Sequence, residues 1–173
     1  HASLMVLLWD ALATGKTAVL SRSFGEETRL ASGTGWLSYA RCHDDIGLGY
    51  DEEKILRAGF TPRAHRRFLL DFYSGRYPGS FARGRLFMED PRTGDARISG
   101  TCASLCGLEK ALEEGDGAAV NLAVKRIMLL HGLAASLTGI PLVFSGDELG
   151  LVNDFSWLDD PALADDKIGR AHV

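Results

Sequence analysis

Two clusters of acidic side chains, each placed directly after a short hydrophobic segment, have the residue types that sugar chemistry requires. They are His43-Asp44-Asp45 and Asp147-Glu148. An imidazole beside carboxylates offers hydrogen bonds to sugar hydroxyls and stabilises developing positive charge. Glycoside cleavage needs such groups, because its transition state resembles an oxocarbenium ion. The clusters therefore predict a carbohydrate-active site, and the alternative interpretation is a pair of solvated surface loops.

The same residue types offer little to a metal ion. His43, Asp44 and Asp45 are adjacent in sequence, so they cannot all reach one ion without a strained backbone, and the alternating Asp/Asn pattern of calcium loops is absent. Cys102 and Cys106 have no neighbouring Cys/His pair to complete a zinc site. The sequence therefore predicts no metal site and no cofactor.

Hydrophobic patterning places both acidic clusters at the ends of strands. Residues 36–42 alternate and are rich in aromatic side chains, which predicts a short strand, and residues 140–144 predict a buried one. The segments between them predict helices at 62–73, 101–114 and 118–137, a hairpin turn at 91–94, and a helix C-cap at Gly139. Because these connections are too long for a hairpin, we expect the two strands to be parallel, in an α/β fold with its active site at their carboxyl ends.

Composition limits the class of protein and the partners. The chain has 173 residues, of which 46% are hydrophobic and 24% charged, as is typical of one globular domain. A formal net charge of −4 argues against a nucleic-acid partner, which would favour a basic surface. Gly132, Gly139 and Pro141 interrupt the apolar run at 127–144, so we expect no membrane span.

The first residues indicate that the sequence is part of a longer domain. Apolar side chains recur at three- and four-residue spacing from Leu4 to Leu12, so we expect the chain to begin inside a helix. Two parallel strands are also too few for a closed sheet. The odd number of cysteines, three, and the lack of a visible signal peptide favour the cytoplasm. Secretion stays open, because the true N-terminus is expected upstream.

Four segments, in order, carry a specific family resemblance. Residues 39–47 read Y-A-R-C-H-D-D-I-G, residues 79–84 read G-S-F-A-R-G, residues 93–101 read T-G-D-A-R-I-S-G-T, and residues 138–150 read T-G-I-P-L-V-F-S-G-D-E-L-G. They resemble the strand-seven motif, the loop that follows it and the strand-eight motif of glycoside hydrolase family 13, the α-amylase family. The H-D-D-I-G version is similar to the amylosucrase branch, as is the helical segment at residues 7–13.

This resemblance implies a fragment of a (β/α)₈ TIM barrel, with residues 1–167 supplying strands seven and eight, their helices and the inserted loop. The implied reaction is retaining transfer of glucose from sucrose to an α-1,4-glucan, with release of fructose. Asp44 matches the carboxylate that grips the glucosyl hydroxyls and stabilises the transition state. His43 matches the histidine that binds the same sugar. Asp45 and Arg97 match the pair that contacts the fructosyl unit or the incoming acceptor.

The family's nucleophile and general acid/base belong to strands four and five, which the resemblance places upstream of His1. Asp147 and Glu148 match a motif that is mainly structural in the family. Residues 87–90 read F-M-E-D where the family has F-Q-Y-N, so a thioether replaces an amide that would face the acceptor.

Three other interpretations remain. The parent could be a sucrose hydrolase, which shares the H-D-D-I-G motif, or another glycosidase of the α-amylase family. The chain by itself could be a non-catalytic sugar-binding piece.

Residues 168–173 read I-G-R-A-H-V, which is what a common sequencing adapter encodes, so we expect a non-native tail there. The expected partners are sucrose and an α-glucan acceptor.

Overall fold

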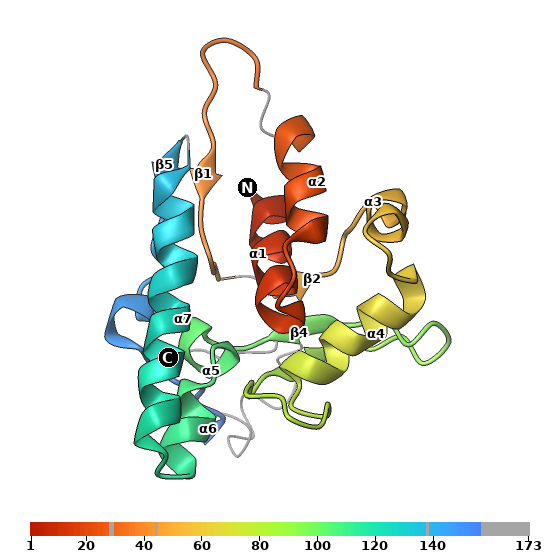
Figure 1. The fold of residues 1–173 in the computed structure, drawn as a ribbon. Coiled ribbons are helices and arrows are strands. Elements are labelled where there is room, and N and C mark those ends of the chain that lie inside the picture. The colour runs from red at the N-terminus through yellow and green to blue at the C-terminus, as the bar shows by residue number, and fades with distance from the viewer. Residues whose placement is uncertain (28–29, 44, 138, 157–173) are drawn as a thin grey trace.

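The computed structural model describes residues 1–27, 30–43, 45–137 and 139–156 (Figure 1). The predicted tail at 168–173 lies outside the described residues. In chain order the helices and strands are α1 (Ala2–Thr14), α2 (Ala18–Glu27), β1 (Leu37–Ser38), β2 (Ile46–Gly47), α3 (Glu52–Arg57), α4 (Pro62–Tyr73), β3 (Arg85–Phe87), β4 (Arg97–Ser99), α5 (Cys102–Leu105), α6 (Leu108–Glu113), α7 (Gly117–Ser136), β5 (Ile140–Pro141) and the 3₁₀ turn η1 (Asp147–Leu149).

The described strands form two small sheets. β1 and β5 pair in parallel, with Leu37 opposite Ile140. β2, β4 and β3 form an antiparallel sheet, in which Ile98 lies between Ile46 and Leu86. The parallel sheet lies against the upper end of α7, and the antiparallel sheet lies below α1 (Figure 1).

Helix α1 packs at the centre of the core. Trp9, only 1% exposed, donates from Nε1 to the carbonyl of Ala40 at 2.8 Å and so fixes α1 to the segment after β1. The Tyr73 hydroxyl donates to the Trp9 carbonyl at 2.5 Å, which joins α1 to α4, and the two rings meet edge to face with centroids 5.5 Å apart. The segment that leads to His43 is therefore attached to a buried helix and not left as a surface loop.

Several predicted elements are confirmed. The helix at 62–73 has the predicted bounds, with Pro62 in its first turn where a missing N–H costs nothing. The hairpin around residues 91–94 is the β3–β4 pair, and the strands on either side of the long connection are parallel, as predicted. The predicted helix at 101–114 is divided into α5 and α6 at Gly107, whose φ of 97° favours glycine.

Other predictions about the strands are wrong. The strands predicted at 36–42 and 140–144 each pair over two residues only, and β5 is exposed, not buried: Ile140 is 65% exposed. Leu137, not Gly139, is the C-cap of α7. The physical reason is that, within the described part of the chain, each of these strands has a single neighbour. A parallel strand is normally covered on both sides and both faces, and the described residues form no closed barrel.

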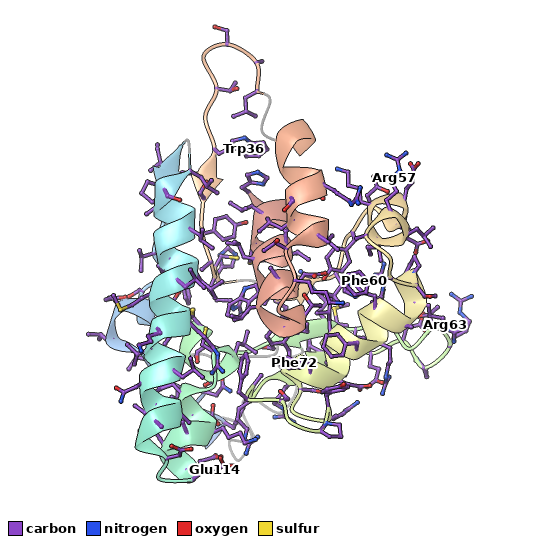
Figure 2. All side chains as sticks on the ribbon, viewed as in Figure 1. Trp36, Arg57, Phe60, Arg63, Phe72 and Glu114 are labelled. Carbon is purple, nitrogen blue, oxygen red and sulfur yellow. The ribbon has the colours of Figure 1, made fainter. Side chains whose placement is uncertain are left out.

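The outer side of α7 is apolar and is not covered by the described residues. Side chains project from this helix away from the other elements (Figure 2). Met128 and Leu129 are 68% and 55% exposed. α7 is also long and apolar enough to cross a membrane, and the core helix of a soluble protein meets the same criteria. The exclusion of a membrane partner therefore stays a prediction.

We expect the isolated chain to self-associate through this face, and two adjacent leucines test the expectation. Leu129→Lys adds a charge on the exposed side, so it should reduce association while changing the free energy of unfolding by about 0.5 kcal/mol or less. Leu130 is 2% exposed. Leu130→Lys buries an unpaired ammonium and should destabilise the fold by more than about 3 kcal/mol. Sedimentation velocity measures the association, and thermal unfolding followed by circular dichroism measures the stability. If the two variants associate equally and are equally stable, Leu129 is not on an exposed association face.

Candidate functional site

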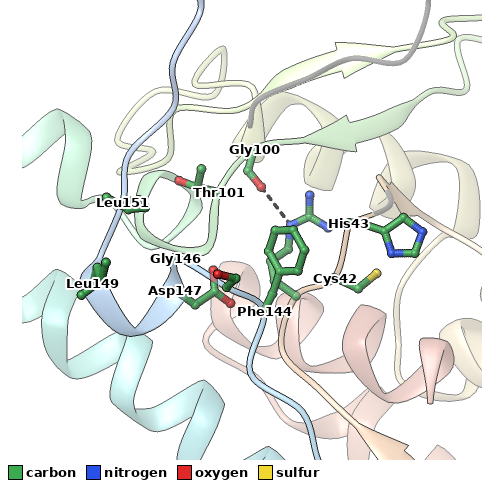
Figure 3. A pocket seen from close by; sticks show the side chains of 11 residues that line it. Cys42, His43, Gly100, Thr101, Phe144, Gly146, Asp147, Leu149 and Leu151 are labelled. Atoms are coloured by element: carbon green, nitrogen blue, oxygen red, sulfur yellow. Dashed lines mark hydrogen bonds between the residues drawn. The ribbon is translucent and has the colours of Figure 1, made fainter. Parts of the chain in front are cut away.

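A pocket of about 330 Å³ lies beyond the carboxyl ends of β1 and β5, where the segments that follow these strands face the segment between β4 and α5 (Figure 3). It is lined by Arg41, Cys42, His43, Gly100, Thr101, Phe144, Ser145, Gly146, Asp147, Leu149 and Leu151. Because β1 and β5 are parallel neighbours, residues that follow them meet at one edge, as the strand-end argument predicts.

Arg41 is the buried cation of this pocket. The residue is only 3% exposed, and its Nε donates to the carbonyl of Gly100 at 2.8 Å (Figure 3). Burial lowers the pKa of Arg41, while the nearby acidic groups, Asp45 and Asp147 among them, oppose that shift. A guanidinium remains charged even so. Sequence reasoning assigned Arg41 to a strand and missed its place in the site, although a charged residue two positions before His43 was the available signal.

The predicted sugar-binding residues are distributed between two places. His43 is exposed and lines the pocket, whereas Asp44 lies outside the described residues. Asp45 is half-buried, and its carbonyl accepts a hydrogen bond from Arg97 Nη2 at 3.2 Å. The structure thus places Asp45 and Arg97 side by side, the two residues that the resemblance pairs. Their role in binding fructose or an acceptor stays a prediction.

Arg97 faces a second, more open groove. Met88, Asp90 and Asp95 line it together with Arg97. Met88 is 68% exposed and has a φ of 53°, an unusual backbone conformation for a side chain of this size. The residue that departs from the family pattern therefore lies beside one of the predicted binding residues.

The two acidic residues after β5 have structural partners. Asp147 is buried, and its Oδ2 lies 3.5 Å from His131 Nε2 on α7. This contact raises the pKa of His131 to about 10, with a further contribution from the thiol of Cys102, whose Sγ lies 3.8 Å from the same nitrogen. Glu148 is exposed, and its Oε2 accepts from the backbone N–H of Gly146 at 2.9 Å. Sequence reasoning missed this cluster, because its members lie on three separate elements.

The ion pair between His131 and Asp147 predicts that the stability of the fold depends on pH. The measurement is made with a chelator, so that no trace metal ion competes for the two side chains. The pKa of His131 is raised from 6.5 to about 10. A raised folded-state pKa contributes stability that is fully present below about pH 6.5 and is lost as the pH rises to about 10. Urea unfolding at intervals across this window should show the decline. His131→Gln should flatten it, and an equally steep decline in that variant contradicts the assignment.

A search against models of known protein families finds none that matches this chain. The likeness to the α-amylase family therefore depends on the short sequence segments that carry it, and it stays a prediction.

Proposed function

We propose that this chain is the strand-seven and strand-eight part of an amylosucrase-type (β/α)₈ barrel, which transfers glucose from sucrose to an α-1,4-glucan and releases fructose. One observation carries the proposal: β1 and β5 are parallel neighbours, and the residues that follow both strands line one pocket. This is where a barrel of parallel strands holds its substrate.

The exposed apolar surface supports the same proposal. Ile140 in β5 and the outer side of α7 are uncovered in the described part of the chain. In a complete barrel, further strands and helices cover such surfaces. The antiparallel sheet β2-β4-β3 corresponds to the insertion after strand seven, and it holds Arg97 against the backbone of Asp45.

In the proposed mechanism the residues of this chain bind and position the sugars. His43 and Asp44 hydrogen-bond to hydroxyls of the glucosyl ring, and Asp44 stabilises the oxocarbenium-like transition state through them. Asp45 and Arg97 position the fructosyl unit and then the glucan acceptor. The nucleophile that forms the glucosyl-enzyme intermediate and the general acid/base come from the rest of the barrel. No cofactor takes part in this mechanism.

The test is made on a longer open reading frame that extends upstream of His1 and supplies the other strands. The purified enzyme is incubated with sucrose while fructose, glucose and glucan are measured. Fructose in excess of glucose, together with new glucan, supports the transferase. Equal amounts of fructose and glucose support a sucrose hydrolase instead. No release of fructose contradicts the sucrose assignment for both.

A second candidate function, sugar binding without turnover, concerns the chain by itself. Asp147 is held against His131 and Glu148 caps its own turn, so neither is placed as a nucleophile or general acid. Binding of sucrose measured by ligand-observed NMR, with no fructose released, would support this function. Loss of that binding in His43→Ala would assign it to the pocket.

A further inference from the structure

Three potential metal ligands from three elements meet beside the pocket. Cys102 begins α5, His131 lies in α7, and Asp147 begins the turn after β5. One ligand atom from each lies within 4.8 Å of the other two. His131 Nε2 is 3.8 Å from Cys102 Sγ and 3.5 Å from Asp147 Oδ2. None of the three is among the residues to which the proposed sugar chemistry assigns a role.

The hydrogen bonding within this cluster is incomplete. Cys102 and Asp147 both approach the same nitrogen of His131, and a single N–H cannot serve both well. The side chain of Asp147 is 4% exposed, and its Oδ2 accepts no hydrogen bond from the described residues. The ion pair with His131 at 3.5 Å therefore compensates this buried oxygen without a hydrogen bond, and a bound cation would compensate it more fully.

The donor types and their spacing fit a particular class of ion. Thiolate, imidazole and carboxylate together are ligands of zinc, which is borderline soft and prefers four tetrahedral ligands. Bond lengths of about 2.3 Å to sulfur and about 2.1 Å to nitrogen and oxygen separate the sulfur and nitrogen by about 3.6 Å and the nitrogen and oxygen by about 3.4 Å. The corresponding separations in the chain are 3.8 Å and 3.5 Å.

We propose that Cys102, His131 and Asp147 bind a divalent transition-metal ion, with zinc as the best match. Asp147 and Thr101, the neighbour of Cys102, both line the pocket, so the fourth position opens toward it and takes a water molecule. On binding, the thiol and the imidazolium each release a proton to solvent, and the carboxylate binds as it stands. The ion joins α5, α7 and the segment after β5, and it holds the pocket wall from Phe144 to Asp147 in place.

This proposal does not depend on the sucrose assignment, and its test needs no activity. The chain, fused to a soluble carrier that lacks cysteine, is stripped with a chelator and titrated with Co²⁺ and then Zn²⁺. We expect the near-ultraviolet charge-transfer band of a thiolate bound to Co²⁺, together with the visible bands of four-coordinate Co²⁺, and their loss as Zn²⁺ displaces the cobalt. Zn²⁺ should also raise the unfolding temperature of the chain.

Variants assign the band to the proposed residues. Cys102→Ser should abolish it, and His131→Gln and Asp147→Asn should each weaken zinc binding by at least about 10-fold, the scale of losing even an outer partner. Cys42→Ser is the matched control, because Cys42 lines the same pocket but lies outside the cluster. Circular dichroism checks that each variant is folded.

Four results would overturn the proposal. They are the absence of the band in the unsubstituted chain, its survival in Cys102→Ser, its loss in Cys42→Ser, and an affinity for zinc that is unchanged in urea. The last result would assign zinc binding to the unfolded chain.

Discussion

Replacing Asp10 with alanine is expected to destabilise the chain by about 3 kcal/mol, a large part of the roughly 5–15 kcal/mol that stabilises an ordinary domain. Asp10 on α1 and His65 on α4 form a buried pair, with 2.5 Å between Oδ2 and Nε2 and side chains only 1% and 2% exposed. The centroids of the Phe60 ring and the His65 imidazole are 4.4 Å apart, so water has little access to the imidazole once the carboxylate is removed.

Burial raises the pKa of the neighbouring Tyr50, and the charge of Asp10 raises it further. Removing one partner of such a buried pair costs about 3–5 kcal/mol, and we expect a loss at the lower end of this range. The measurement is urea unfolding of the carrier-fused chain followed by circular dichroism.

A matched control comes from an exposed ion pair. Glu53 and Arg57 on α3 have side chains 67% and 63% exposed. Glu53→Ala should therefore change the free energy of unfolding by about 1 kcal/mol or less. If Asp10→Ala costs no more than Glu53→Ala, the buried pair does not stabilise the junction of α1 and α4.

In the proposed sucrose-cleaving barrel, Asp44→Asn is expected to reduce sucrose turnover by on the order of 100-fold or more. Hydrogen bonds that ring hydroxyls donate to a carboxylate in this position strengthen in the transition state and supply several kcal/mol, and each 1.36 kcal/mol is a factor of about 10 in rate. An amide keeps the size of the side chain but removes its negative charge. The loss should therefore fall mainly on kcat and much less on KM for sucrose.

The adjacent carboxylate is the control for this prediction. The side chain of Asp45 is half-buried, and its backbone carbonyl accepts from Arg97. If Asp45 contacts the fructosyl unit or the acceptor, Asp45→Asn should alter KM and the ratio of glucan to free glucose more than kcat. Initial rates of fructose release and product analysis separate the two outcomes. An Asp44→Asn enzyme with near-normal kcat would show that the strand-seven assignment is wrong, even where sucrose is still the substrate.

Local signals in the sequence determined the elements that depend on neighbouring residues. Pro62 and the apolar spacing that follows predicted α4 with its observed bounds, because a first-turn proline and one apolar face act within a single helix. The hairpin at 91–94 was equally local. The division of the predicted helix at Gly107 was missed, although the glycine stood in the sequence.

The site could be predicted only in part. His43 was placed at the carboxyl end of a strand by pattern, and the proximity of Asp45 and Arg97 followed from the family resemblance alone. Their roles with sugars stay predictions. Strand length and burial were predicted wrongly because they depend on neighbouring strands. β5 has one neighbouring strand in the described part of the chain. A local sequence pattern does not predict the number of neighbouring strands.

The tertiary structure alone decided which distant polar groups meet. The pairing of Asp10 with His65 and the convergence of Cys102, His131 and Asp147 join residues from separate helices and loops. Neither follows from spacing, since each depends on how helices pack across the core. The sequence by itself predicted the start of α4, the start of α7 to within one residue and which residues follow the strands, because hydrophobic periodicity and backbone preference act over a few residues. It did not predict α2 or α3. Packing over long distances then determined which of those residues share a buried, poorly solvated space.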